Sequence, residues 1–118
     1  MRTLNEYSID LTNGGTLVLS TSTPETDPSV VFDAGQFISV AFNATVAIDI
    51  ACTADVLVNT ADPVTGAVTV DFPATALRAS GVATLSGPVH LVAGDILALE
   101  GDASAGTGSV HCSAIIRR

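Results

Sequence analysis

Apolar and polar residues alternate with a period of two along most of the chain, and helical periodicity is nearly absent. This alternation predicts half-buried β-strands, and the clearest run predicts one long strand or two strands joined by a bend. The side chains between its apolar positions are small and mostly neutral, which suits burial against another layer or subunit better than open water. The apolar positions of this run are all even-numbered: Ile38, Val40, Phe42, Val46, Ile48, Ile50 and Cys52.

Short alternating segments separated by Gly, Pro, Asp and Asn fill the rest of the chain. Residues 7–11 and 15–20 predict a first hairpin, because Asn13-Gly14-Gly15 between them suits the positive φ angles of a tight turn. Residues 21–36 form the longest break, with 30–32 as a short strand or anchor inside it. The remaining strands are expected at 55–59, 68–72, 82–85, 89–92, 96–100 and 109–116, with a turn at 62–66 and one helical turn at 73–79. Together they predict an all-β protein, an antiparallel β-sandwich of jelly-roll type with about eight to ten short strands.

The length of 118 residues predicts a single domain, 1–118, with residues 1–6 as a candidate N-terminal arm. Charged residues make up only 14% of the chain, against about 25% in ordinary soluble domains. We therefore expect copies of the chain, or a partner, to cover much of its surface. Four arginines and no lysine face twelve acids, and the net charge of −8 argues against nucleic-acid or anionic membrane partners. The first residues lack the apolar segment of a secretory signal, and no run is long enough to span a bilayer.

The soft metal ligands of the chain are His90, His111, Cys52 and Cys112, and their spacing matches no zinc motif. His111 and Cys112 are neighbours on a predicted strand and therefore point to opposite faces. We expect no metal site, and whether the two cysteines pair stays open. Neither histidine lies in a polar loop, and no nucleophile-elbow sequence is present, so we expect no catalytic residues, no cofactor and no enzyme activity. A hydrolase would require His90 or His111 to meet a Ser or Asp in a cleft.

Six aspartates fall in or beside predicted loops, where hard oxygen ligands for calcium could converge. No Asp-x-Asp-x-Asp loop is present, and loop aspartates most often serve turns and solubility. The chain has no Trp and a single Tyr, which counts against a sugar-binding platform. Whether any loop binds calcium or sugar stays open. The six residues are Asp27, Asp33, Asp55, Asp62, Asp95 and Asp102.

The closing segment Val89-His-Leu-Val-Ala-Gly94-Asp95-Ile-Leu-Ala-Leu, followed by a Gly-containing turn and a last strand, resembles the end of a known group of domains. These are the trimeric jelly rolls, the tumour-necrosis-factor-like and complement-globular-head-like domains. Chain length and strand count agree with this group over most of the chain, although the aromatic residues usual in its trimer cores are scarce here. The resemblance implies a homotrimer whose last strand ends near the three-fold axis.

As a small, cysteine-poor, lysine-free β-domain, the chain also resembles tailed-phage capsid decoration (cement) proteins and head-fibre domains. This likeness of type implies a structural protein of the virion that is made in the host cytoplasm. It would bind the major capsid protein on the outer surface of the head as a trimer. The alternative is a ligand- or carbohydrate-binding jelly-roll module, or a receptor-binding head or fibre domain. The candidate capsid contacts come from the N-terminal arm and the loop near residue 30: Met1, Arg2, Leu4, Tyr7, Val30, Val31 and Phe32.

Overall fold

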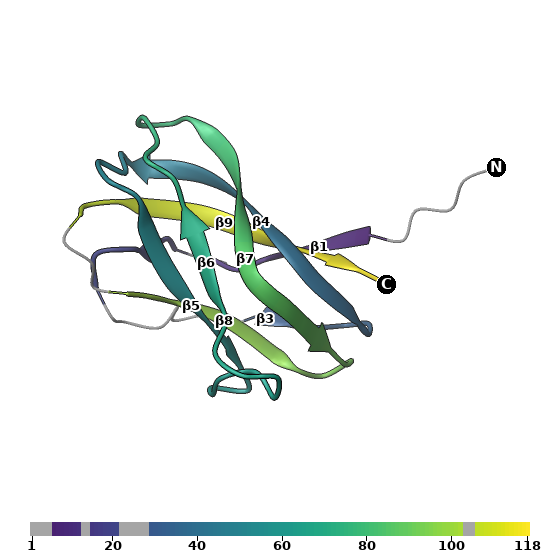
Figure 1. Cartoon of the computed structure of the whole chain (residues 1–118). Helices are drawn as coiled ribbons and strands as arrows, with labels where there is room; N and C mark the ends of the chain where they lie inside the picture. The colour runs from purple at the N-terminus through teal and green to yellow at the C-terminus, as the bar shows by residue number, and fades with distance from the viewer. Residues whose placement is uncertain (1–5, 13–14, 22–28, 103–105) are drawn as a thin grey trace.

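The computed structural model describes residues 6–12, 15–21, 29–102 and 106–118. This part of the chain folds into nine β-strands (Figure 1). Within it, no helix has the length and apolar character needed to cross a membrane. The strands are β1 (Glu6–Asp10), β2 (Leu17–Val18), β3 (Ser29–Val30), β4 (Gly35–Val46), β5 (Cys52–Val58), β6 (Thr69–Phe72), β7 (Ser80–Leu91), β8 (Ile96–Gly101) and β9 (Ser109–Arg117).

The strands form two antiparallel layers. Sheet one has the order β1-β9-β4-β7, with β2 also paired to β9, and sheet two has the order β6-β5-β8-β3. Apart from β2, the first strand pairs with the last, β3 with β8, β4 with β7 and β5 with β6. This nested pairing is the jelly-roll arrangement. The predicted antiparallel β-sandwich of jelly-roll type is therefore confirmed.

A short β6–β7 ladder joins the two sheets along one side, through the pairs Val70 with Leu85 and Asp71 with Thr84. The sandwich is consequently almost closed into a barrel. The outer faces of the two sheets run into one another across this seam. Pro73 directly follows β6. Because proline has no backbone N–H to donate, it cannot extend the β6–β7 ladder.

Alternate side chains of both sheets point inward and share one core. Phe37 and Phe72 are the largest of them and are each 1% exposed. The rings of Phe42 and Phe72 meet edge to face across the core, with centroids 5.2 Å apart. Burial of a side chain of this size contributes about 1.5–3 kcal/mol of transfer free energy. The period-two pattern is thus the main determinant of the fold.

A β-bulge in β4 changes which side chains reach this core. The register of β4 with both β7 and β9 shifts between Phe37 and Ser39. Because an extra residue reverses the inward and outward positions, Phe37 enters the core and Ile38 is only half-buried. The predicted alternation, which places Ile38 on the same face as Val40 and Phe42, fails at Ile38 for this reason. Val40 and Phe42 do lie inward.

The chain bends between β4 and β5, so the long run of even-numbered apolar residues belongs to two strands. Ile48 is buried at the bend, where its backbone exchanges hydrogen bonds of 2.9 and 3.0 Å with Thr75. Ile50 lies in the same connection and is 50% exposed. The alternating row therefore does not continue through Ile50, because β4 has already ended at Val46.

The predicted first hairpin is not formed by the described residues. β1 and β2 both pair with β9, one at each end of its free edge, and not with each other. The backbone N–H groups of Leu11 and Leu19 also donate to β9 and its approach, to Cys112 O and Gly108 O, each at 2.9 Å. The long edge of β9 thus takes both segments, and the residues of the expected turn, 13 and 14, lie outside the described ranges.

The connections between strands gather at the two ends of the sandwich (Figure 1). β1 begins and β9 ends at one of them, the terminal end, which also carries the β3–β4 and β7–β8 connections. The opposite, distal end carries the β4–β5 and β6–β7 connections. The single helical turn predicted at 73–79 is a tight turn there, closed by a 3.0 Å hydrogen bond from Ala79 N–H to Ala76 O.

Candidate interaction surfaces

The outer face of sheet one carries small, uncharged side chains across three neighbouring strands. One row across it consists of Ser113, Ala41 and Val82, and the next of Ile115, Ser39 and Thr84. Their neighbours along each strand are buried, so alternation directs this set outward. We call this set the neutral face: Ser39, Ala41, Asn43, Val82, Thr84, Ser113 and Ile115.

Charge appears only at the margins of the neutral face. Glu6 on the edge strand β1 forms an exposed ion pair of 3.0 Å with Arg117. Asp10, at the other end of β1, lies opposite Ser113. A partner that covered the middle of this face would displace water from hydroxyl, methyl and backbone groups and would bury no charge. The free energy needed to remove water from such a surface is small.

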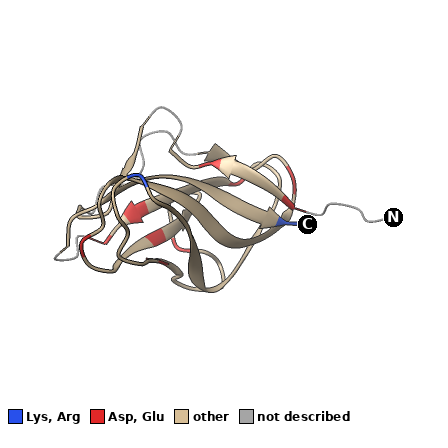
Figure 2. Cartoon of the chain, turned by 90° about the horizontal axis from the view of Figure 1, so that it is seen from above, with Lys and Arg blue, Asp and Glu red and all other residues tan. Residues whose placement is uncertain are grey.

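The outer face of sheet two is acidic. Asp55 on β5 lies opposite Glu100 on β8, and this pair is flanked by Asp71 on β6 and by Asp102 directly after β8. Partial burial raises the pKa of Asp55 above its ordinary value, and the negative charges of Asp102 and Asp62 raise it further. Figure 2 shows acidic positions on several strands and loops and basic ones at the C-terminus and one turn. This face favours water or a cationic partner, and the two sides of the sandwich differ sharply.

An aromatic cluster lies at the terminal end, where two of the candidate capsid contacts meet. The rings of Tyr7 and Phe32 have centroids 4.4 Å apart. The Tyr7 hydroxyl donates to the backbone oxygen of Asp33, and the Asp33 carboxylate accepts a 2.7 Å hydrogen bond from Arg118. The Arg118 guanidinium also lies 5.6 Å from the Tyr7 ring centre. Burial, followed by the Asp33 charge, raises the pKa of Tyr7 above its ordinary value.

The remaining candidate contacts divide between surface, core and undescribed chain. Val30 and Phe32 are 61% and 66% exposed, whereas Val31 between them is fully buried. Alternation places Val31 in the core, so it does not belong to this surface. Met1, Arg2 and Leu4 lie outside the described residues. We call Tyr7, Val30, Phe32, Asp33 and Arg118 the terminal patch.

The predicted Gly-Asp corner positions this patch. Gly94 has a φ of 94°, a conformation that glycine adopts without strain, and its N–H donates to Val31 O at 2.8 Å. Asp95 closes the corner, because its carboxylate accepts the Val92 N–H at 2.9 Å. The segment that carries Val30 and Phe32 is therefore fixed against the β7–β8 corner.

His111 lies with Asp10 and Thr12 at the margin of the neutral face. Its Nδ1 is 2.8 Å from Thr12 Oγ1 and its Nε2 is 3.5 Å from Asp10 Oδ1. A hydrolytic triad needs an accessible hydroxyl beside a histidine that a carboxylate orients. Thr12 is only 2% exposed, and its Oγ1 also accepts the Cys112 N–H. This threonine therefore ties the β1–β2 connection to β9 and does not present a nucleophile.

The other candidate ligands stay apart. His90 is exposed on the outer face of β7, and Cys52 and Cys112 are both buried as thiols in the core. In the described ranges, no three His, Cys, Asp or Glu side chains converge closely enough to hold a metal ion. Of the loop aspartates, Asp102 accepts a 2.5 Å hydrogen bond from Thr53, while Asp27 lies outside the described residues.

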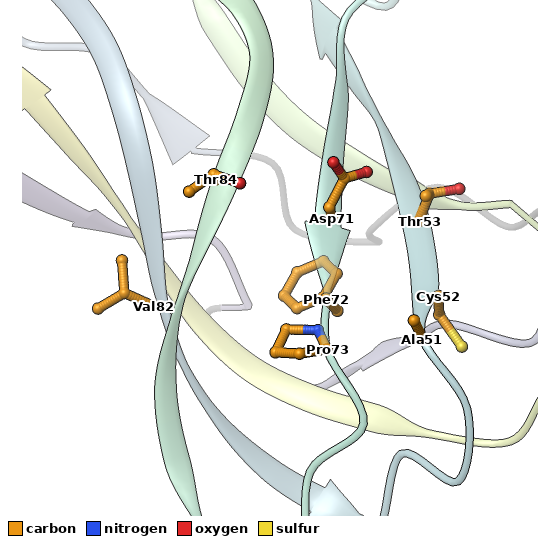
Figure 3. A pocket seen from close by; sticks show the side chains of 8 residues that line it. All are labelled: Ala51, Cys52, Thr53, Asp71, Phe72, Pro73, Val82 and Thr84. Carbon is orange, nitrogen blue, oxygen red and sulfur yellow. The ribbon is translucent and has the colours of Figure 1, made fainter.

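A shallow hollow of about 410 Å³ opens at the β6–β7 seam (Figure 3). It forms because the ladder ends after Asp71, so Pro73 and Val82 are no longer bridged by hydrogen bonds. Its floor and walls are mainly apolar, and Asp71 and the hydroxyl residues stand on its rim. The lining residues are Ala51, Cys52, Thr53, Asp71, Phe72, Pro73, Val82 and Thr84.

Comparisons with protein-family models, curated proteins and solved structures found no match to this chain. Its function must therefore be inferred from these surfaces. Sequence reasoning identified Tyr7 and Phe32 but missed their partners Asp33 and Arg118, because nothing local links positions so distant in the chain. It also missed the hollow, for which Pro73 directly after an alternating strand was an available signal.

Proposed function

We propose that this chain is a non-enzymatic structural protein that binds the outer surface of a phage head as a trimer and stabilises it. The observation that supports this best is the contrast between the neutral face of sheet one and the acidic face of sheet two. A solitary domain of net charge −8 gains solubility from spreading its charges, yet on this side they are confined to the margins of the neutral face. That side suits burial against further copies of the chain.

The terminal patch supports a second contact, with the shell. Phe32 and Val30 expose more than half of their surface, next to an aromatic ring and an arginine. Exposed aromatic and arginine side chains are frequent anchors of protein interfaces. Three such patches in one trimer would bind a capsid lattice far more tightly than one patch, because the second and third contacts become intramolecular.

The test has two measurements. Light scattering of the purified protein should give a mass near three chains, and Ala41→Glu should lower it, because the new carboxylate would be buried without a partner. Ala67→Glu, on the exposed β5–β6 connection, is the matched control and should leave the mass unchanged. A wild-type protein that stays a single chain over a range of salt would contradict the proposed trimer.

The second measurement is co-sedimentation with capsids that lack the protein. Phe32→Ser should lower the bound fraction, whereas Val64→Ser, which changes an even more exposed apolar residue in the β5–β6 turn, should not. Equal binding by wild type and Phe32→Ser would remove the terminal patch from the shell contact.

A second candidate function, a ligand- or carbohydrate-binding module, is supported by the hollow beside Phe72. Its floor is apolar and its rim carries hydroxyl groups and a carboxylate, as small-molecule sites often do. A monomeric protein that binds immobilised glycans, with binding lost in Thr84→Val, would favour this function over the capsid role.

A further inference from the structure

The hollow at the seam has the chemistry of a socket for an apolar side chain next to a cation. Pro73 and Val82 line it from opposite sides, and Val82 is 61% exposed. Asp71 stands on its rim, directly opposite Thr84 in the β6–β7 ladder (Figure 3). Among the described residues, neither the Asp71 carboxylate nor the Thr84 hydroxyl has a hydrogen-bond or ion-pair partner.

The surroundings of Asp71 strengthen its preference for a cation. Its other cross-strand neighbour is Thr53, which donates to Asp102 at 2.5 Å. Asp55 lies on the same outer face of sheet two, where partial burial, and then the charges of Asp102 and Asp62, raise its pKa. A cation brought to the rim would therefore meet a field of negative charge, and its apolar neighbour would meet the walls of the hollow.

A complementary projection lies at the same end of the molecule. In the turn after Pro73, Leu77 is 55% exposed and Arg78 is exposed as well. Arg117 and Arg118 form ion pairs, whereas the Arg78 guanidinium forms none within the described chain. Leu77 and Arg78 thus present one apolar group and one unpaired cation side by side.

The backbone of this projection is held firmly. The Arg78 N–H donates to Ala44 O at 2.7 Å, and Arg78 O accepts from the Asn43 side chain at 2.9 Å. Arg78 has a φ of 65°, which is uncommon for a residue other than glycine and persists where surrounding contacts enforce it. A projection fixed in this way loses little conformational freedom on binding.

The projection and the hollow are different surfaces: Pro73 and Val82 line the hollow, and the projection lies on the β6–β7 connection between them in sequence. A contact between two different surfaces is heterologous, and repeated by pure rotation it closes a ring of copies.

We infer that the hollow beside Phe72 binds the Leu77–Arg78 turn of a neighbouring copy, with Leu77 against Pro73 and Val82 and the Arg78 guanidinium on Asp71. This inference rests on the proposed self-assembly and specifies which residues lock it. The neutral face contributes area that is buried between copies. The Arg78–Asp71 pair determines which surface of one copy meets which surface of the next.

Charge reversal tests the pairing. Asp71→Arg and Arg78→Asp should each weaken assembly about ten-fold or more, measured as the dissociation constant by sedimentation equilibrium. The double variant Asp71→Arg/Arg78→Asp restores an attractive pair and should recover most of the loss. Asp62→Arg, on the exposed β5–β6 turn, is the matched control and should assemble as the wild type does. Far-UV circular dichroism of each variant verifies that the fold is kept.

The outcomes separate this inference from the proposed function. Single variants that assemble normally, while Ala41→Glu dissociates, would overturn the socket and leave the neutral face as the interface. Single variants that dissociate without recovery in the double variant would also overturn it, because the two residues would then not be partners. A monomeric wild type would overturn both proposals, and a small ligand would then be the occupant to seek in the hollow.

Discussion

Gly101 is the position where a single methyl group should disturb this fold most clearly. It is the last residue of β8, it is buried, and the segment after β2 crosses directly over it. A Cβ atom at Gly101 would lie 2.2 Å from Thr21 O and 2.5 Å from Val18 O. Ordinary carbon–oxygen contacts are about 3.3 Å or longer. Both obstacles are backbone atoms, so Gly101→Ala forces β8 and the crossing segment about 1 Å apart.

The size of the effect follows from two opposing contributions. Overpacking of a well-packed interior typically costs about 1–3 kcal/mol, and a clash with backbone on two sides belongs at the upper end. Replacing glycine by alanine also restricts the unfolded chain, which stabilises the fold by about 0.4–1 kcal/mol. We therefore expect Gly101→Ala to lower the free energy of unfolding by about 2 kcal/mol.

Gly15→Ala is the matched control, because a Cβ atom there has no neighbour within 4 Å. It carries the same unfolded-state gain without the clash and should be neutral or slightly stabilising. Urea unfolding followed by far-UV circular dichroism measures both variants, at one fixed protein concentration because self-assembly would add to stability. A loss of 2 kcal/mol lowers the urea midpoint by about 1 M. Midpoints for the two variants within about 0.3 M of each other would refute the crossing as described.

Two carboxyl groups should give pH effects of opposite sign. The Thr107 N–H donates to the Asp49 carboxylate at 2.6 Å and is the main cause that lowers the pKa of Asp49. The ionised carboxylate therefore stabilises the fold above its ordinary pKa near 4. This stabilisation disappears as the pH falls through the pKa of Asp49 in the folded state. Asp49→Asn should lower the urea midpoint at pH 7, and the difference from the wild type should shrink progressively as the pH is lowered below about 4; equal midpoints at pH 7 would contradict this. The pKa of Asp55 is instead raised by burial and by Asp102 and Asp62, so its ionised form destabilises the fold at neutral pH and the penalty disappears as acid protonates it. Asp55→Asn should raise the midpoint at pH 7, with the gain absent below about pH 3, and a lower midpoint at pH 7 would show that Asp55 has an unrecognised favourable partner.

Period-two patterning predicted the fold class and most strand positions, and it failed where tertiary contacts override local sequence. The strands expected at 96–100 and 109–116 are β8 and β9 almost to the residue. The bulge at Ile38 was not predictable. Phe37 and Ile38 put apolar side chains at both odd and even positions there, so the alternation does not reveal which of them faces inward. The hairpin expected around Asn13-Gly14-Gly15 did not form, since the long edge of β9 binds both flanking segments.

The sequence predicted what kinds of residue the candidate surfaces contain, but not which of those residues lie together in the fold. Low charge density predicted that some face would be neutral, yet only the pairing of β4 with β7 and β9 shows that the small side chains form continuous rows. Tyr7 and Phe32 were selected as separate apolar groups. Their contact depends on the approach of β1 to the β3–β4 connection, which no short-range pattern encodes.

The pairing of β1 with β9 also sets the order of events on the ribosome. β1 emerges first, but its partner strand is β9, and Glu6 contacts Arg117 across 111 positions of sequence. At translation speeds of about 5–20 residues per second, β1 waits roughly 5–20 seconds for that partner. During this interval β4 also lacks one neighbour, and open strand edges can pair with other nascent chains on the same messenger RNA. Folding should therefore occur in one late step after residue 117 has emerged, and the crowded polysome is where this protein is most exposed to mispairing.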